Sequence, residues 1–420
     1  MAEPLHPTPR PRLRWRKLLM FGIGAALLGS LAAWYGIQTL AGWRWDAMKS
    51  RLEALRVQSR SRSPSRPALY GSMHPGNAWE DYALILKQAE PLLSETEGLM
   101  YYADGHPKGD PAKVRNFLSS HSDLIRALSA ATHRESATFP ESWEADARQA
   151  SFDKKLNLPS SAGRASAKAT MAEGSYRPAV EMLLDQLVYA RDVCHNAPRL
   201  RASSGLGQYR RALTDLKDLV TSPGVPVDVL IDLDEALERA DASFPDPRLV
   251  MERDLIEDGD LLTSANVSPD GLTLQGLLHW RYMFSWRVLV ADAFQHIDAW
   301  SLRISNAYSR SGAELARVMN DVDRECAESH NVVAPELMPI HGIFRSSLRV
   351  RAQLHLLRVA THYLGKGQIA KLDDPFGDSL RFREHGNRLS IWSIGPDGVD
   401  QGGLGSWSEG QDIVLEVERH

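Results

Sequence analysis

The stretch LLMFGIGAALLGSLAAWYGIQTLAG, residues 18–42, decides how this chain is organised. It runs for 25 residues without a charged side chain, and a helix needs only ~20 apolar residues to cross the hydrocarbon core of a bilayer. It follows one acidic residue, Glu3, and five basic residues: Arg10, Arg12, Arg14, Arg16 and Lys17. Positively charged flanks stay in the cytoplasm. The sequence therefore predicts a single-pass helix in a bacterial inner membrane, with residues 1–17 in the cytoplasm and the bulk of the chain in the periplasm.

Aromatic residues at both ends support a spanning helix, because amphipathic rings prefer the headgroup layer. They are Trp15, Trp34, Tyr35, Trp43 and Trp45. A cleaved signal peptide is the alternative, since Ser30-Leu31-Ala32 is an acceptable cleavage site. Signal peptides usually have a shorter apolar core of about 7–15 residues. A type IV pilin leader does not fit, because Gly22 is followed by Ile23 and the segment contains no acidic residue.

Composition narrows the class of the remaining chain. The 420 residues are 43% hydrophobic and 24% charged, which is ordinary for a globular protein. The net charge is −4, and subtracting +4 for residues 1–17 leaves −8 for residues 43–420. A mildly acidic chain argues against nucleic acid as a partner. Two cysteines exclude a disulfide-dense scaffold and any four-thiolate metal site.

Hydrophobic periodicity predicts a mainly helical body. A short stalk helix, with Met48, Leu52 and Leu55 on one stripe, precedes a Ser-, Pro- and Arg-rich run that we interpret as a solvated linker; together they form residues 43–67. The body occupies residues 68–342, with Asn77 and Asp110 as N-caps of helices that reach Leu93 and Ala131. Further helices are predicted at Arg177–Asn196, Leu206–Val220, Val227–Ala242, Pro247–Asp258 and Gly312–His330.

Two segments of the body stand apart. Residues 134–176 are weakly patterned and rich in Ala, Ser and Lys, so we interpret them as a long connection with at most a short helix. The segment Leu277–Ala307 is the most apolar outside the anchor, and it predicts a helix in the centre of the core. An aromatic ligand groove is the alternative. Its stripe is Tyr282, Trp286, Leu289, Ala293, Ile297, Trp300 and Ile304.

No arrangement typical of a catalytic site occurs, because the sequence has no Gly-x-Ser-x-Gly, Walker or His-Glu-x-x-His motif. Cys194 and His195 are adjacent, so on a helix they point ~100° apart and share a proton poorly. Cys194 and Cys326 either form a bridge, as an oxidising compartment permits, or stay as two free buried thiols. Glu325, Glu328 and His330 lack the spacing of a zinc pair and are interpreted as a solvated acidic surface.

The last long helix, Ile343–Leu364, is followed by a change in composition after Gly365. Its apolar stripe is Phe344, Leu348, Ala352, Leu356, Val359 and Tyr363, and its polar side is Arg351, His355, Arg358 and His362. Alternating residues then predict three antiparallel strands, which begin near Leu380, Leu389 and Asp412. The predicted fold class is mainly α, with an N-terminal transmembrane helix, a multi-helix extracytoplasmic body and a small C-terminal antiparallel β meander.

Four short motifs lie in order along this C-terminal part: Asp374-Pro375-Phe376-Gly377, Ser393-Ile394-Gly395-Pro396-Asp397-Gly398, Gly402-Gly403 and Asp412-Ile413. With them, residues 343–420 resemble the C-terminal domain of the major pseudopilins of type II secretion. The same ending closes larger membrane-anchored proteins of planctomycete-like bacteria, which this chain resembles more. It departs from pseudopilins in lacking their leader and in placing 300 residues between the anchor and this helix.

The resemblance implies a calcium site, because the loop between the last strands of pseudopilins binds Ca²⁺ through aspartates and backbone carbonyls. The matching positions here are Asp397 and Asp412, with Asp400 as a weaker third ligand. Calcium takes about six to eight hard oxygen ligands, and a Gly-rich loop lets carbonyls converge on it. The alternative is that Asp397-Gly398 is a tight turn and Asp412 a loop cap.

The function expected from these features is that of a membrane-anchored extracytoplasmic structural or adaptor protein. Its expected partners are the lipid bilayer and envelope or secretion-system proteins, with a link to a type II secretion or pilus-like system. The alternative is an envelope hydrolase or ligand-binding protein whose site is dispersed in the helical body. Because the sequence shows no catalytic arrangement, we expect a protein that is not an enzyme.

Overall fold

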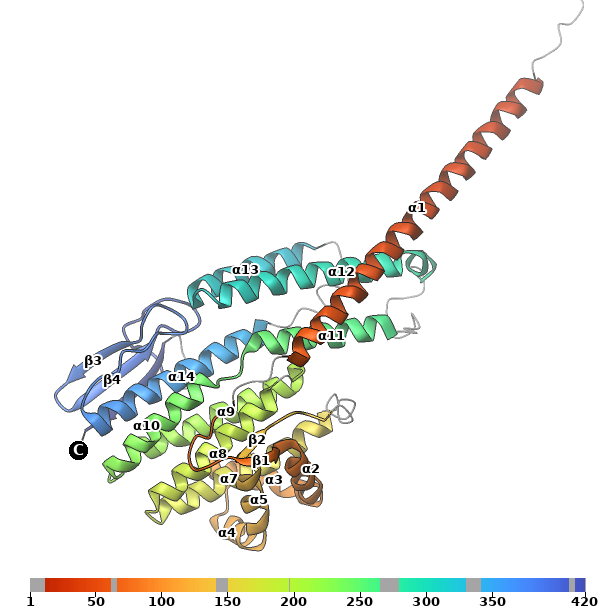
Figure 1. Ribbon diagram of the computed structural model, residues 1–420. Coiled ribbons are helices and arrows are strands. Elements are labelled where there is room, and N and C mark those ends of the chain that lie inside the picture. Colours follow the sequence, from red (N-terminus) through yellow and green to blue (C-terminus); the bar gives the residue numbers. More distant parts are fainter. Residues whose placement is uncertain are drawn as a thin grey trace, which may run out of the picture.

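The computed structural model describes residues 12–61, 66–140, 150–195, 197–264, 279–329, 341–407 and 412–419. Within these ranges the protein is mainly helical, with a small three-stranded antiparallel sheet near the C-terminus (Figure 1). One N-terminal helix is long and apolar enough to cross a membrane. These features confirm the outline of the predicted fold class.

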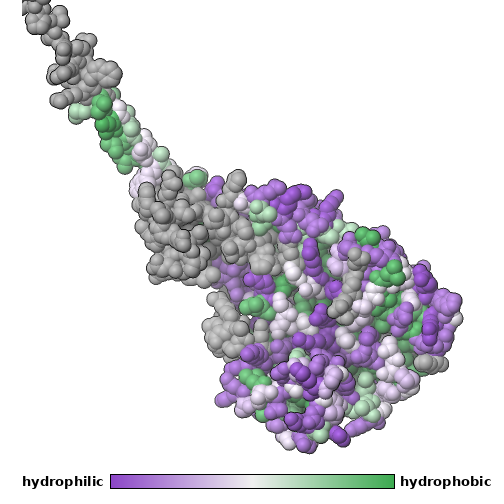
Figure 2. Space-filling model, turned by 180° about the vertical axis from the view of Figure 1, so that it is seen from behind, coloured by the Kyte–Doolittle hydropathy of each residue, from purple (hydrophilic) through white to green (hydrophobic). Residues whose placement is uncertain are grey.

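The first helix, α1 (Arg12–Ser61), is a single helix of 50 residues. Its apolar window, Leu19–Gly36, has a mean hydropathy of 1.5 and no residue buried in the protein. Figure 1 shows α1 projecting from the body as a long rod, and Figure 2 shows apolar surface gathered along this projection. The anchor and the stalk, which the sequence analysis treats as separate, are therefore parts of one helix.

The second half of α1 belongs to the core of the body. Met48, Leu52 and Leu55 are each only 2% exposed, so the predicted stripe is confirmed. It packs against α11 (Pro247–Ser264) and α12 (His279–Tyr308). The fit is close at Gly259 of α11, where an added Cβ would lie 2.4 Å from a methyl carbon of Leu52. The stalk is therefore a core element, which hydropathy alone did not indicate.

The remaining helices follow the sequence predictions in most places. Asn77 and Asp110 cap α2 and α4 as predicted, through side-chain oxygens that accept from backbone N–H groups. One predicted helix is divided: the segment after Asp110 forms α4 and α5, which meet at His121. The bounds are α2 Ala78–Ala89, 3-10 helix η1 Glu90–Glu95, α3 Thr96–Ala103, α4 Pro111–Ser120, α5 Ser122–Thr132, α8 Tyr176–Cys194, α9 Arg199–Val220, α10 Val227–Ala242, α13 Gly312–Glu328 and α14 His341–Lys366.

The interpretation of residues 134–176 as a connection is wrong. They contain α7 (Ala150–Ala172), a helix of 23 residues with Pro159 inside it. Its middle is buried nearly all round by small residues, which carry little hydropathy signal but allow helices to approach closely. At Gly163 an added Cβ would lie 2.0 Å from the Gln186 side-chain nitrogen of α8. This close packing explains why a sequence poor in large apolar residues forms a core helix.

The core has two main parts. An N-terminal cluster joins α2 to α5 with α7 and the face of α8 that carries Tyr189 and Val193. A larger cluster runs without a break from α1 through α8, α9, α10, α12 and α14 to the C-terminal sheet. Residues 343–420 therefore share their core with the body. The described part of the predicted α12 stripe is buried, as is the whole α14 stripe; the side chains of Tyr282, Trp286 and Leu289 lie outside the described set.

The predicted meander is confirmed as β3 (Arg381–His385), β4 (Arg388–Ser393) and β5 (Ile413–Glu418), in the order β3-β4-β5. Leu389 and Ile391 of β4 lie on the face that packs on α14, opposite Val417 and Leu415 of β5. A parallel pair of short strands, β1 (His74–Asn77) and β2 (Arg134–Ser136), was not predicted. It ties the start of the body to the end of α5.

Candidate functional site

The seam between α1 and the body is the first candidate site. Arg44 of α1 lies 2.9 Å from Asp292 of α12, and Arg51 makes a bidentate pair with Asp298 of α12, both bonds at 3.0 Å. Arg56 pairs with Asp260 of α11. Each pair is partly exposed and contributes little energy by itself. Together they fix the register of α1 against two helices, so α1 cannot slide or rotate freely relative to the body.

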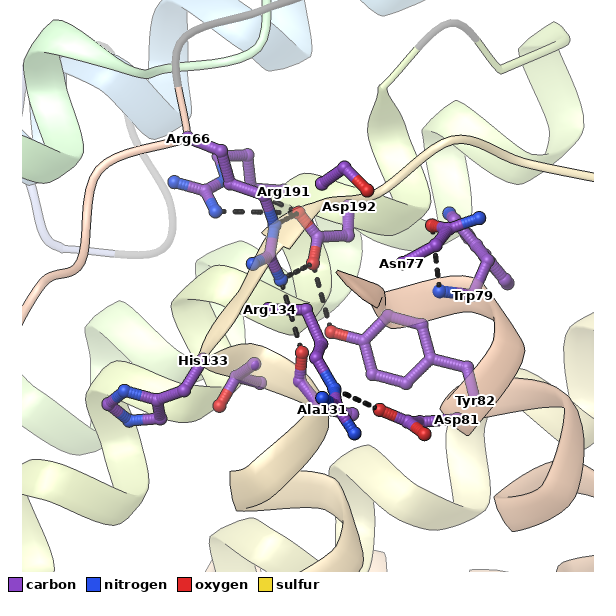
Figure 3. Close-up of polar contacts among 12 residues, drawn as sticks. Arg66, Asn77, Trp79, Asp81, Tyr82, Ala131, His133, Arg134, Arg191 and Asp192 are labelled. Atoms are coloured by element: carbon purple, nitrogen blue, oxygen red, sulfur yellow. Dashed lines mark hydrogen bonds and ion pairs between the residues drawn. The ribbon is translucent and has the colours of Figure 1, made fainter. Parts of the chain in front are cut away.

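A buried cluster around Asp192 is the second candidate site (Figure 3). The Asp192 carboxylate is 2% exposed and accepts from Arg66 Nη2 at 2.6 Å and from Tyr82 Oη at 2.9 Å. Arg191 lies 3.4 Å from the same carboxylate and donates to Ser243 Oγ on α10. Arg66 also donates to the Ala131 carbonyl of α5. We call Arg66, Tyr82, Arg191 and Asp192 the Asp192 clasp.

The Asp192 clasp joins elements that are far apart in the chain. Arg66 comes from the segment expected to be a solvated linker, yet its side chain is only 4% exposed; this expectation is wrong at Arg66. Burial and the neighbouring carboxylate hold the Tyr82 pKa far above its usual range, so the phenol stays a donor. Each of the four side chains of the Asp192 clasp therefore interacts with another side chain of the clasp.

A second polar contact continues the same interface. Thr132 donates to Asp185 at 2.6 Å, and His133 Nε2 lies 3.6 Å from the same carboxylate. The ring of His133 also contacts the Ser72 carbonyl at 3.1 Å through Nδ1. Hydrogen bonding to Asp185 raises the His133 pKa against the opposing effect of burial. The protonated ring therefore strengthens the contact between α5 and α8.

The predicted polar side of the last helix is not a solvated surface. His355 Nε2 lies 3.0 Å from Asp241 Oδ1, and Arg358 Nη1 donates to the other oxygen at 2.8 Å. Arg351 pairs with the same carboxylate. Burial alone would raise the Asp241 pKa, but the hydrogen bond from His355 and the nearby cations lower it to about 2. His362 pairs with Asp234 at 2.8 Å. These contacts join α14 to α10.

The two cysteines are free thiols, so the disulfide alternative is not adopted. Burial raises the Cys194 pKa well above its usual range. The backbone leaves the helix at His195, and burial lowers the His195 pKa to about 4. At neutral pH a protonated thiol therefore stands next to a neutral imidazole. This pair has the opposite electrostatics to an activated thiolate–imidazolium pair.

Glu325 of the predicted acidic surface lies in a specific contact. It accepts from Arg303 at 2.6 Å and from Trp300 Nε1 at 3.0 Å, which joins α13 to α12. The hydrogen bond from Arg303 lowers the Glu325 pKa. His330 lies outside the described residues. Among the described part of the chain, no three His, Cys, Asp or Glu side chains gather as a metal site would need.

The three aspartates assigned to calcium lie in the loop between β4 and β5, and each one accepts from nearby donors. Asp412 is completely buried and accepts from the Gly403 amide at 2.8 Å. Asp400 accepts from Trp392 Nε1 at 3.0 Å and from the Gly402 amide at 2.8 Å. Asp397 accepts from the Val399 amide at 3.2 Å and from the Gln401 side chain at 2.7 Å. The loop is therefore organised by its own hydrogen bonds, and calcium binding stays a prediction.

Asp374, which the sequence analysis did not consider as a site residue, connects two of the motifs. It is 3% exposed and accepts from the Phe376 amide, from Ser393 Oγ and from the Ile394 amide, at 2.9, 2.7 and 2.9 Å. The Asp-Pro-Phe-Gly turn thus holds the end of β4. The signal available in the sequence was the motif itself, because an aspartate before proline commonly organises a turn.

Comparison with known proteins finds no matching family model, no similar curated protein and no similar solved structure. The functional conclusion therefore depends on the geometry of the chain itself. The charged clusters described above join helices to one another, and each of their carboxylates already accepts hydrogen bonds from nearby donors. The feature that differs from an ordinary helical protein is α1, whose first half is exposed and apolar and whose second half is core.

Proposed function

We propose that this chain is a membrane-anchored extracytoplasmic structural or adaptor protein. The observation that carries the proposal is the continuity of α1. Its window Leu19–Gly36 exposes apolar side chains along its length, whereas Met48, Leu52 and Leu55 of the same helix are buried in the body. An exposed apolar helix of this length is stable in a bilayer and unfavourable in water.

The signal-peptide alternative is less well supported by this arrangement. A signal peptide is removed and has no part in the folded domain, but α1 continues from the apolar window into the core without a break. Cleavage at Ser30-Leu31-Ala32 would leave a projecting helix end with Trp34, Tyr35 and Leu40 exposed. A retained anchor gives those side chains a lipid environment.

The retained anchor can be tested with an epitope tag at each end of the full chain. We expect both tags on one polypeptide that stays in the membrane pellet after alkaline carbonate extraction. The matched control carries Leu27→Arg and Leu31→Arg in the apolar window, and it should shift to the soluble fraction. Loss of the N-terminal tag from the mature chain, with the remainder released by carbonate, would contradict the anchor.

We propose further that α14 and the meander serve as a pseudopilin-like contact module for a secretion or pilus-like system. The support is that two of the motifs that resemble that family are in contact here, since Asp374 of the first motif accepts hydrogen bonds from Ser393 and Ile394 of the second. The module also exposes Leu404 and Val399, at 76% and 57%. Such side chains on an ordered loop are suited to contact with another protein.

This link is tested by photo-cross-linking in cells, with the cross-linker at Leu404 in one variant and at Val399 in another. A cross-linker at Leu302, which is 57% exposed on α12, is the matched control. The proposal expects a secretion or pilus-system protein captured from the module positions and not from Leu302. Capture that is the same from all three positions, or from none, would argue against the module.

A further inference from the structure

Only a few residues of α1 separate the end of the apolar window from the first contact with the body. Trp43 is 77% exposed and follows the end of the apolar window, Gly36, by seven residues. At 1.5 Å per residue this is ~10 Å along the helix, a few Å beyond the outer edge of a headgroup layer about 5–8 Å thick on each side of the hydrocarbon. The next residue, Arg44, already contacts Asp292 of the body.

The direction of α12 brings the body closer still. Arg44 pairs with Asp292 and Arg51 pairs with Asp298, so α1 and α12 run in the same direction. The N-terminal end of α12 therefore points back toward the membrane. The helix begins at His279, and its residues before Asp292 extend for ~20 Å. That length exceeds the ~12 Å that separate Arg44 from Gly36 along α1.

The sequence of this end of α12 suits a lipid surface. Residues 279–289 read HWRYMFSWRVL, with two Trp, one Tyr and two Arg among apolar residues. Tryptophan, tyrosine and arginine are the residues that favour the boundary between headgroups and acyl chains. The chemistry is that of a peripheral contact with an anionic bilayer.

We propose that the body rests directly on the headgroup layer, with the first turns of α12 lying in it beside α1. This inference rests on the proposed membrane anchor. The body is then not connected to the membrane by a flexible stalk. One helix crosses the bilayer, and a second helix contacts the membrane surface next to it. These two contacts fix the distance of the body from the membrane and its orientation, and the C-terminal sheet lies at the end of the molecule away from α1 (Figure 1).

Fluorescence quenching in reconstituted vesicles tests this contact. The full chain, in a Cys326→Ser background where Cys194 stays buried, is labelled at one introduced cysteine: Leu28→Cys, Trp43→Cys, Trp280→Cys or Leu404→Cys. The vesicles contain equal amounts of phosphatidylcholine and phosphatidylglycerol, with nitroxide quenchers either at the headgroup or deep in the acyl chains. Leu28 is 70% exposed in the middle of the apolar window, and Leu404 is the distal control.

The expected result is deep quenching at Leu28, headgroup quenching at Trp43 and Trp280, and no quenching at Leu404. Inserting Gly-Ser-Gly-Ser between Gly42 and Trp43 adds up to about 13 Å of chain and should abolish the Trp280 signal while the Leu28 signal persists. A Trp280 label that is as unquenched as Leu404, with Leu28 still quenched, would overturn the proposed surface contact alone. An unquenched Leu28 would overturn the anchor, and the surface contact with it.

Discussion

At the scale of single residues, the strongest constraints are carboxylates that bind partners from distant parts of the chain. Asp192 accepts from Arg66 and Tyr82, and Asp241 accepts from His355 and Arg358. In each case the partners are more than 100 residues apart in sequence. Sequence periodicity describes neighbours on one helix, so it could place these residues on helices but could not pair them.

The Asp192 clasp predicts a specific stability loss. Asp192→Ala leaves Arg66 and Arg191 buried without their counter-charge, so the free energy of unfolding should fall by about 3–5 kcal/mol. The measurement is urea denaturation of the full chain in detergent. The matched control is Asp228→Ala, whose partner Arg177 and whose own side chain are largely exposed, and it should leave stability unchanged. If Asp192→Ala and Asp228→Ala have the same free energy of unfolding, the Asp192 clasp does not stabilise the fold.

Asp258 of α11 predicts that the stability of the protein falls as the pH rises. Burial raises its pKa from 3.8 to about 7, with a smaller contribution from Asp254. Because the folded state binds this proton more tightly than the unfolded state, stability falls as pH rises from about 4 to 7. Asp258→Asn should therefore raise Tm at pH 8 and leave it unchanged at pH 4. A Tm difference that is the same at both pH values would contradict the raised pKa. Asp260→Asn, which loses the pair with Arg56, should give no increase at either pH.

At the scale of elements, α1 and α7 were mispredicted for different reasons. The stripe Met48, Leu52 and Leu55 was visible, but its separation from the body was assumed because a Ser- and Pro-rich run follows it. The helix α7 was missed because most of its buried residues from Ser160 to Ala167 are Ala, Ser and Gly, whose contribution to packing depends on the facing helix α8. By contrast, α14 and the meander were predicted well, since large apolar residues recur there at regular spacing.

The stalk half of α1 predicts that truncating its buried face destabilises the whole body. Leu55→Ala should lower the free energy of unfolding by about 2–5 kcal/mol, because it leaves a cavity between α1 and the body. Val57, two residues later on the same helix, is 68% exposed, and Val57→Ala should have no comparable effect. The comparison is made by thermal denaturation in detergent. If both variants melt alike, the stalk is not part of the core.

The loop between β4 and β5 carries the calcium prediction. If Asp397, Asp400 and Asp412 hold Ca²⁺, chelation by EDTA should increase proteolysis between Val399 and Gln411, and added calcium should reverse it. Asp397→Asn should mimic EDTA, while Asp378→Asn, in the turn before β3, should not. Stabilisation by a bound ion reaches ~2.7 kcal/mol at one hundred times its Kd. Cleavage that ignores calcium, with no binding in calorimetry, would leave Asp397-Gly398 as a tight turn.

At the scale of the whole molecule, one continuous core connects the stalk half of α1 to the C-terminal sheet. From sequence we divided the chain after residue 67, where a Ser- and Pro-rich run ends, and after residue 342, where the resemblance begins, but one core crosses both positions. A boundary in composition reports a change of local structure, whereas a domain boundary requires few contacts across it. The body and residues 343–420 should accordingly unfold together.

We propose that α1 spans the membrane with its N-terminus in the cytoplasm and the body outside. The most direct test is labelling of Leu404→Cys, in a Cys326→Ser background, by a membrane-impermeant maleimide in intact spheroplasts. We expect labelling of Leu404→Cys without lysis, because this side chain is 76% exposed in the loop between β4 and β5. A cysteine placed at Ala2 should be labelled only after lysis. Labelling of Ala2→Cys in intact spheroplasts, with Leu404→Cys protected until lysis, would contradict the proposed orientation.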